Sequence, residues 1–516
     1  MGGRAQARQH QVVCFDLAPI FDLPPTNPTT SHSIQEPMRL PRCHHLARRR
    51  PLARQVSPVS HPNLPRRTSS PTRRPLTTLA IETSCDDTAV AILTRDPEDG
   101  RSRLVFNERI SSDHRQFRGI EPLVAVQGHT SALAPLLRRA VERMPSHGDG
   151  GRARGCPDFV SVTRGPGIMP NLSVGLSTAK GLAVAWNVPL VGVHHMQAHA
   201  LTPRLVRSLG MRMPVDEGEG AGTASGPEFP FMTLLVSGGH TQLVHSRSLT
   251  DHRIIATTAD VAIGNLLDHA ARDILPTDVL ESAEDVMYGR VLEAFAFPDG
   301  GTPEEYAAAF QPSATRADEL VDHPTGYDWI LPLPLRHTRR LEYSFTAIGT
   351  TVQRIAKANP SMSVPERRAL ARHTMASAFR HLASRICLAL EDDKVKWALR
   401  DTSTLVIAGG VACNRFLLHT LRSTLEARAH GHIRFVVPPP ELCTDNAAMI
   451  AWTGMEMFEG GHHTDLSVLA INKWPMDPDK GPGIMGAPGW LKRDVGVRDA
   501  LDCGPYGNAE DDKFHR

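Results

Sequence analysis

LAIETSCDDTAVAIL, residues 79–93, is the most informative segment of the sequence for the fold. Two apolar runs flank a polar centre, a pattern that predicts a strand, a turn and a second strand. The turn carries Asp86 and Asp87, so acids stand at the tip of the expected hairpin. Asp86 is therefore a candidate for handling a proton or for positioning a substrate, whereas acids at hairpin tips are more often simply solvated.

A second pattern of the same kind, FMTLLVSGGHTQL, occupies residues 231–243. Other segments predict alternating strands and helices: strands at 159–163, 188–193 and 405–408, a helix at 172–185, and a helix that opens near Asn414. Such alternation is typical of α/β proteins. One glycine-tipped and one acid-tipped strand turn, one in each half, indicate a duplicated nucleotide-binding core with a cleft between two lobes.

Charge divides the 516-residue chain into a basic leader and an acidic body. Residues 1–75 hold twelve arginines, no lysine and three acids, a balance of +9, which leaves −7 for the rest of a chain whose net charge is +2. This excludes a globally basic nucleic-acid binder but not a local basic patch. An Arg-rich, acid-poor and Ser-containing leader is typical of a mitochondrial presequence, and the alternative is a disordered tail without an address.

Cysteine spacing and hydropathy exclude further classes. The eight cysteines form no CxxC pair, which supports neither a zinc ribbon nor a disulfide framework and suits a reducing compartment. No apolar run reaches the roughly 18 residues that a membrane span needs, so no membrane partner is expected.

Metal-binding chemistry is indicated by His195-Met196-Gln197-Ala198-His199. Two imidazoles at positions i and i+4 share one face of a helix and can hold one metal ion. The residue after His195 is not the glutamate of HExxH, which weakens a peptidase interpretation. With 25 histidines in the chain, such a pair also arises by chance.

Asp445 is the candidate third ligand, because it stands where a helix begins in the stretch CTDNAAMI, residues 443–450. An aspartate at a helix start is usually an N-cap. Two histidines and one carboxylate equally describe an open metal site with room for water or substrate. The spacing alone leaves both interpretations open.

Three glycine turns each follow an expected strand: Gly165-Pro166-Gly167, Ser237-Gly238-Gly239 and Gly409-Gly410. Such turns offer backbone N–H groups to phosphates or carboxylates without obstruction by a Cβ atom. None fits the Walker or the dinucleotide-binding pattern. Asn414, after the third turn, could hydrogen-bond a ribose or a base edge.

Six motifs stand in an order that resembles the universal tRNA threonylcarbamoyladenosine transferase family, in older usage O-sialoglycoprotein endopeptidase-like. They are IETSCDDT (81–88), TRGPGIMPNLSVGLSTAKGLA (163–183), HHMQAH (194–199), VSGGHTQL (236–243), AGGVACN (408–414) and CTDNAAMIAW (443–452). The resemblance covers roughly residues 77–477. The Arg-rich leader and the WPMD ending at 474–477 resemble the mitochondrial branch.

The resemblance implies a two-lobed actin/Hsp70/sugar-kinase-like fold with duplicated RNase H-like cores. It implies one divalent metal ion, zinc or iron, on His195, His199 and Asp445. It implies that the threonylcarbamoyl-phosphate part of an adenylate meets Leu235, Val236, Ser237, Gly238 and Gly239. The nucleoside part is expected to meet Asp268, Asn414 and a displaced Gly-Gly pair, for which Gly301 is the best candidate.

Departures from the family pattern concern the nucleoside side of the site. Asn265 and His269 replace a Glu and a Lys around Asp268, and Gly349 replaces a Lys in the stretch SFTAIGT, residues 344–350. These changes leave the three metal-ligand positions untouched. They raise the alternative that this chain is a catalytically weakened scaffold of a modifying complex.

The implied reaction transfers a threonylcarbamoyl group from threonylcarbamoyl-AMP, supplied by a separate synthase, to N6 of adenosine 37 in mitochondrial tRNAs that read ANN codons. A homodimer in the mitochondrial matrix is implied as well. An ATP hydrolase or phosphotransferase on the same fold is the alternative enzyme. Because the body is acidic, tRNA contacts are expected on local basic surfaces, with Arg115 and Arg118 in the first lobe and Arg336, Arg339 and Arg340 in the second as candidates.

The expected organisation follows from these assignments. Residues 1–75 form the presequence, 76–205 the first lobe, 206–228 a flexible insertion, 229–477 the second lobe with a closing helix, and 478–516 a C-terminal tail.

Overall fold

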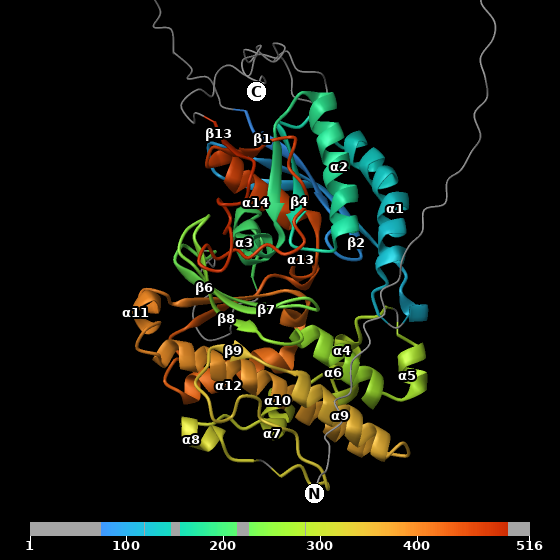
Figure 1. The fold of residues 1–516 in the computed structure, drawn as a ribbon, viewed down its shortest axis with the longest axis vertical. Helices are drawn as coiled ribbons and strands as arrows, with labels where there is room; N and C mark the ends of the chain where they lie inside the picture. The colour runs from blue at the N-terminus through green and yellow to red at the C-terminus, as the bar shows by residue number, and fades with distance from the viewer. Residues whose placement is uncertain are drawn as a thin grey trace, which may run out of the picture. The chain divides into compact units, whose positions relative to one another are not determined.

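The computed structural model describes residues 74–117, 119–145, 155–213, 226–283, 285–322 and 324–493. Within these ranges the strands form one sheet of seven and one of six (Figure 1). Nearly all of the expected leader, the centre of the expected insertion, most of the tail and the candidate Arg118 lie outside the described residues.

The first sheet has the order β13-β12-β5-β4-β1-β2-β3. β1 pairs antiparallel with β2 and parallel with β4, and β4 pairs parallel with β5. In that order the strands are β13 (Trp490–Lys492), β12 (His462–Thr464), β5 (Leu190–His194), β4 (Phe159–Gly165), β1 (Leu76–Glu82), β2 (Asp87–Arg95) and β3 (Ser102–Ser111).

The second sheet has the order β11-β10-β6-β7-β8-β9. β6 pairs antiparallel with β7 and parallel with β10, and β10 pairs parallel with β11. The strands are β11 (Arg434–Val436), β10 (Thr404–Ala408), β6 (Phe231–Val236), β7 (Thr241–Ser246), β8 (His252–Thr258) and β9 (Glu342–Tyr343).

Both sheets share one topology, an antiparallel three-strand meander followed by two parallel strands on the other side of the first strand. β1 to β5 form this unit in the first sheet, and β6, β7, β8, β10 and β11 repeat it in the second. The expected α/β class and the duplicated core of an actin/Hsp70/sugar-kinase-like fold are confirmed.

Helices cover both faces of the first sheet because its strands alternate side chains between them. Leu79 and Ile81 pack with α1 and α2 on one face, whereas the small side chain of Ala80 lets α14 pack on the other. These helices are α1 (Pro122–Glu142), α2 (Met169–Trp186), α3 (His195–Ser208) and α14 (Ala447–Glu459).

The helices of the second sheet enclose a separate hydrophobic core. They are α4 (Ile263–Ile274), α5 (Thr277–Glu281), α6 (Tyr288–Ala296), α7 (Pro303–Ala309), α8 (Arg316–Glu319), α9 (Thr346–Ala358), α10 (Val364–Glu391), α11 (Lys396–Leu399), α12 (Arg415–Ala427) and α13 (Pro440–Cys443); the 3₁₀ turns are η1 (Arg115–Phe117) and η2 (Gly410–Cys413). No helix that the structure describes has the length and apolarity to cross a bilayer.

The C-terminal part of the chain differs from the expected organisation. α14 packs on β1, β2, β4 and β5, and β12 and β13 extend the first sheet. The expected second lobe of 229–477 therefore ends near α13, and the expected tail supplies a strand. Local sequence patterns do not reveal this return, since the partners of α14 lie more than 250 residues earlier in the chain.

α3 lies where the two lobes meet. It contacts β5 of the first sheet and β6 and β10 of the second, and its apolar side chains share one cluster with residues from both sheets. The element that carries the histidine pair is thus fixed by both halves of the molecule.

Candidate metal centre and adjoining cleft

The two histidines follow directly from the end of β5. His194 is the N-cap of α3: its Nδ1 accepts a hydrogen bond from the Gln197 N–H at 3.2 Å, and its Nε2 donates to the Trp474 carbonyl at 2.8 Å. Burial lowers the pKa of His194 to about 3, so this ring is neutral. His194 is not part of the group that could hold a metal ion.

His195 and His199 lie one turn apart on α3, with ring centroids 4.7 Å apart and planes at 89°. Their Nε2 atoms are 3.4 Å and 3.0 Å from Asp445 Oδ1. One ligand atom from each of the three residues lies within 4.8 Å of the others, a group that could hold a metal ion. The structure thus brings together the three residues singled out in the sequence.

Asp445 is free to serve as a ligand because its neighbour caps the helix. Asn446 is the N-cap of α14, and its Oδ1 accepts from the Met449 N–H at 3.0 Å. Arg109 on β3 donates to the Thr444 hydroxyl at 2.7 Å and to the Asp445 carbonyl at 3.4 Å. The two interpretations of Asp445 are thereby separated: it is the carboxylate beside the imidazoles, not the cap.

Glu82, at the end of β1, was not recognised in the sequence. Its fully buried carboxylate accepts from the Ser84 N–H at 2.6 Å and from the Thr163 hydroxyl, and lies 3.2 Å from His195 Nδ1. A carboxylate behind a ligating imidazole fixes the tautomer and directs the other ring nitrogen to the metal. The only signal in the sequence was an acid that ends an otherwise apolar strand.

The electrostatics of this group favour a cation. Burial opposes ionisation, yet His195 lowers the pKa of Glu82, and His195 and His199 hold that of Asp445 well below its usual range. Asp445 and Glu82 in turn raise the pKa of His195 to about 10 against the effect of burial. Two ionised carboxylates beside imidazoles form a donor set that matches a borderline divalent ion.

The acids of the first hairpin are buried rather than solvated. Asp86 is 6% exposed, and burial and the charge of Asp445 raise its pKa. Asp87 receives the Ser111 hydroxyl and lies 3.2 Å from Arg109; burial and Asp86 raise its pKa to about 7. The solvated-tip alternative is wrong for these residues.

The Ser237–Gly239 turn joins β6 to β7. His240 N–H donates to the Ser237 hydroxyl at 3.1 Å, and a Cβ added at Gly238 or Gly239 would meet no atom within 4 Å. Burial together with the nearby His195 lowers the pKa of His240 to about 4. The turn, which follows Leu235 and Val236 on β6, is therefore close to the candidate metal centre.

Asp268 on α4 accepts a hydrogen bond from the Gly289 N–H at 2.8 Å. Burial raises the pKa of the Asp268 carboxyl to about 6. Gly301, the candidate from the displaced Gly-Gly pair, adopts φ +67° in a turn against Tyr306, where a Cβ would lie 2.1 Å from the phenol oxygen. The hydrogen bond to Asp268 comes from Gly289, and the expected contact of Gly301 with the nucleoside stays a prediction.

Asn414, 7% exposed, caps a helix. Its Oδ1 accepts from the Leu417 N–H at 2.8 Å, which makes it the N-cap of α12, and its Nδ2 lies 3.7 Å from Met375 Sδ. The family departures Asn265 and His269 are exposed on α4, and Gly349 lies on α9 against Leu266.

The family profile described as TsaD, tRNA N6-adenosine threonylcarbamoyltransferase, matches residues 103–452. The mitochondrial tRNA N6-adenosine threonylcarbamoyltransferase of Schizosaccharomyces pombe is 34% identical over 434 residues, which cover 81% of this chain and 90% of the relative. The chain belongs to the tRNA N6-adenosine threonylcarbamoyltransferase family.

Membership carries the family's reaction, the formation of threonylcarbamoyladenosine in tRNA, and makes this chain a transferase. A Brucella anthropi tRNA N6-adenosine threonylcarbamoyltransferase is 33% identical over 409 residues, with 79% of this chain and 97% of the relative covered. Among solved structures, a ROK family glucokinase from Streptomyces griseus aligns with a TM-score of 0.34 and 11% identity, over 74% of this chain and 99% of that one.

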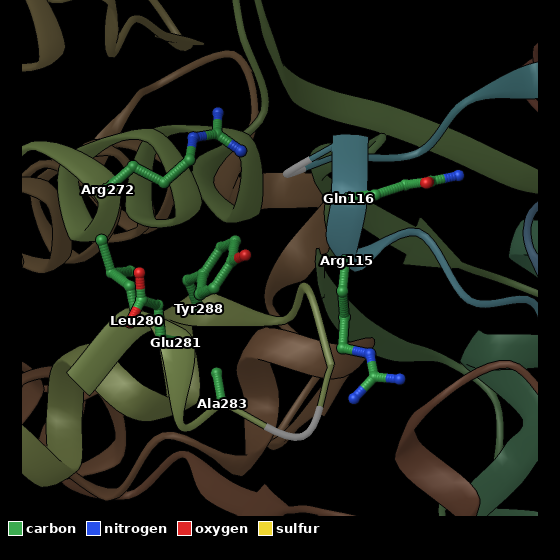
Figure 2. A pocket seen from close by; sticks show the side chains of 7 residues that line it. All are labelled: Arg115, Gln116, Arg272, Leu280, Glu281, Ala283 and Tyr288. Atoms are coloured by element: carbon green, nitrogen blue, oxygen red, sulfur yellow. The ribbon is translucent and has the colours of Figure 1, made fainter. Parts of the chain in front are cut away.

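A cavity of about 270 Å³ lies between η1 of the first lobe and α4, α5 and α6 of the second (Figure 2). Arg115 and Gln116 line it from one side, and Arg272 and Tyr288 from the other. Arg272 is one helical turn from Asp268, and Tyr288 precedes Gly289. In this transferase the cavity therefore adjoins the Asp268–Gly289 pair.

Proposed function

We propose that this chain transfers the threonylcarbamoyl group of threonylcarbamoyl-AMP to N6 of adenosine 37 in mitochondrial tRNAs that read ANN codons. The observation that carries the proposal is the assembly of His195, His199 and Asp445 between two lobes in a member of this family. The Arg-rich leader and the mitochondrial relative support the matrix as its location.

We propose one divalent ion, zinc or iron, per subunit, held by the two imidazoles and the Asp445 carboxylate. When bound, such an ion would supply a Lewis acid for the transfer. Glu82 fixes the His195 ring through Nδ1, and Arg109 holds the backbone of Asp445. The chain's own contribution is thus a prearranged donor set.

The acceptor N6 is a weak nucleophile, because its lone pair is delocalised into the adenine ring. Asp86 is proposed to receive the proton that N6 loses or to orient the N6 amine. The buried carboxylate has a raised pKa and lies in the electrostatic reach of Asp445. A base of raised pKa is better matched to proton transfer near neutral pH than an ordinary aspartate is.

The adenylate is proposed to lie along the second lobe. Backbone N–H groups of the Ser237–Gly239 turn meet its phosphate, which becomes the leaving group, with Leu235 and Val236 beneath. Asp268, Asn414 and Gly301 meet the nucleoside, and the Gly289 N–H holds the Asp268 carboxylate. Positioning of this kind brings both reactants into line.

The tRNA backbone is proposed to contact the cavity lined by Arg115 and Arg272, since it spans both lobes next to Asp268. Arg339 and Arg340 form a second proposed surface. Both side chains are more than half exposed, and their ion pairs with Glu391 and Glu342 are long, at 3.9 Å and 3.8 Å. Arg336 pairs with Asp322 at 3.0 Å, and Arg115 pairs with Asp113 at 2.7 Å. A homodimer is proposed on the resemblance alone.

The test is reconstitution. The chain is mixed with an adenylate-forming synthase, threonine, bicarbonate, ATP and a mitochondrial ANN-decoding tRNA, and the digested nucleosides are analysed by mass spectrometry. We expect threonylcarbamoyladenosine at position 37. Unmodified tRNA beside an active control enzyme contradicts the proposal, and phosphate or ADP release without modified tRNA favours a phosphotransferase instead.

A further inference from the structure

A second cavity lies inside the second lobe, between α8, the chain around Leu333–Arg336 and α10. Four arginines line it, together with a single acid; they are Arg316, Arg336, Arg380, Arg385 and Glu319. None of these residues belongs to the candidate metal centre or to the cavity lined by Arg115 and Arg272. Four positively charged side chains and one negatively charged side chain share a mostly buried space. The excess positive charge requires a counter-charge.

The acids nearby are already engaged. Glu319 lies 2.8 Å from Arg316 and 3.5 Å from Arg428, so one carboxylate serves two guanidinium groups. Arg336 pairs with Asp322 at 3.0 Å. For Arg380 and Arg385, no acidic partner lies within 4.0 Å in the part of the chain that the structure describes.

Arg385 is the least compensated of the four. The residue is 1% exposed. Its Nη1 donates to the carbonyls of Thr338 and Arg340 at 3.2 Å and 2.9 Å, and its Nε has no hydrogen-bond partner. Burial and the neighbouring Arg316 lower its pKa to about 10, which still leaves it charged at physiological pH. A buried, charged donor without an acceptor is costly.

Arg380, five residues earlier on α10, also lacks an acidic partner. Its Nε has no partner either, and its guanidinium lies 5.6 Å from the Phe310 ring centroid. His381 also lines the cavity but does not compensate these charges. Burial lowers its pKa to about 3, so the ring is neutral, and its Nε2 already accepts the Ser344 N–H at 3.1 Å. Both arginines therefore line a cavity whose one acid, Glu319, is already paired with Arg316.

We propose that this cavity binds one small inorganic anion of halide size, between Arg380 and Arg385. Its volume of about 10 Å³ suits one small particle and excludes a nucleotide. A neutral water could accept from the donors but would leave two buried cations uncompensated. A halide supplies both an acceptor and the charge.

The anion would hold the segment before β9 onto α10. Arg316 and Arg385 already bind that segment through the carbonyls of Arg336 and Thr338, and Ser377 on α10 donates to Pro332 O at 2.9 Å. The segment leads into β9 of the second sheet. Anion binding is therefore expected to stabilise the second lobe without taking part in the transfer reaction.

The test compares anions at fixed ionic strength with the full chain. We expect the thermal midpoint to rise with the logarithm of chloride or bromide concentration relative to sodium gluconate, as for a ligand that binds only the folded state. A crystal soaked in bromide is expected to show an anomalous peak between Arg380 and Arg385. A non-anomalous water at that place overturns the proposal.

The variants are Arg380→Gln and its matched control Arg368→Gln. Arg368 lies on the same helix, its guanidinium is also 5.6 Å from a phenylalanine ring, and its Nε is likewise without a partner, but it does not line the cavity. Arg380→Gln should lose the halide response while Arg368→Gln keeps it. Equal responses in both variants, or a halide response that gluconate reproduces, overturn the proposal.

Discussion

At the scale of single residues, Glu82 acts on the metal centre through His195. Since the carboxylate lies 3.2 Å from His195 Nδ1, we expect Glu82→Gln to keep the fold but to weaken metal retention about 10- to 100-fold. Metal content after dialysis against a chelator measures the effect. Glu456→Gln, a second buried glutamate that pairs with Arg204 on α3, is the control; equal losses in both variants would contradict a specific role for Glu82.

Asp268 makes a prediction about pH. Its folded pKa of about 6 lies above the ordinary value, so the folded state binds the proton more tightly than the unfolded state does. Its contribution to stability is present below about pH 4 and is lost as the pH rises through 6. Asp268→Asn should therefore raise the free energy of unfolding relative to the wild type at pH 7.5 but not at pH 4, measured by urea titration; an equal effect at both pH values would refute the assignment.

A helical period placed His195 and His199 on one face, whereas spacing left Asp445 open between a ligand and a helix cap, and the family resemblance supplied it as the third candidate. The same reasoning missed Glu82 and Arg109. Their roles depend on contacts between separate strands and loops, which a linear sequence does not display. The hydrogen bond from Gly289 to Asp268 was missed as well, because it joins two separate helices, whereas the expected nucleoside contact of Gly301 stays a prediction.

At the scale of elements, the start of α4 packs on the Ser237–Gly239 turn. A Cβ at Gly264 would lie 2.7 Å from the Ser237 carbonyl oxygen and from Gly238 N, whereas one at Gly238 would meet nothing within 4 Å. Gly264→Ala should cost roughly 1–3 kcal/mol in the free energy of unfolding, as overpacking does. Gly238→Ala should leave that free energy unchanged and raise the KM for the adenylate. Equal unfolding midpoints in denaturant for the two variants would speak against this packing.

The cap of α14 gives a second prediction at this scale. Asn446 accepts the Met449 N–H and donates to the carbonyls of Leu442 and Thr444, so it fixes both the helix and the segment that carries Asp445. Asn446→Ala should lower the free energy of unfolding by about 1 kcal/mol. Asn446→Asp, which retains a capping oxygen, should recover part of the helix stability; no difference between the two variants in chemical unfolding would argue against capping.

Hairpins and strand–turn–helix units were predictable because their signals are local: apolar runs, polar tips and glycines. The assignment of α14, β12 and β13 to the first sheet was not. Their apolar residues alone do not specify which of the two sheets they join. In the structure, the small side chains of Ala80, Ala89 and Ala91 on the facing strands make room for α14.

At the scale of the whole molecule, an acidic body has to bind an RNA. If the Arg115 cavity meets the tRNA backbone, Arg115→Glu should raise the KM for tRNA about tenfold, reduce the salt dependence of binding and leave the KM for the adenylate unchanged. Arg138→Glu, an 85%-exposed position on α1 outside the cavity, is the charge-matched control. A similar change in both variants, or a raised adenylate KM, would remove the cavity from the tRNA path.

We propose that the centre between the lobes transfers the threonylcarbamoyl group to tRNA. A direct test supplies purified threonylcarbamoyl-AMP and an ANN-decoding mitochondrial tRNA to the metal-loaded chain, without any synthase, and follows modified adenosine by mass spectrometry in a single turnover. We expect modification by the wild type and a rate at least about 100-fold lower for Asp445→Asn and His199→Ala, with Asp445→Asn folded as judged by its thermal midpoint. Wild-type rates in a folded Asp445→Asn variant would contradict it.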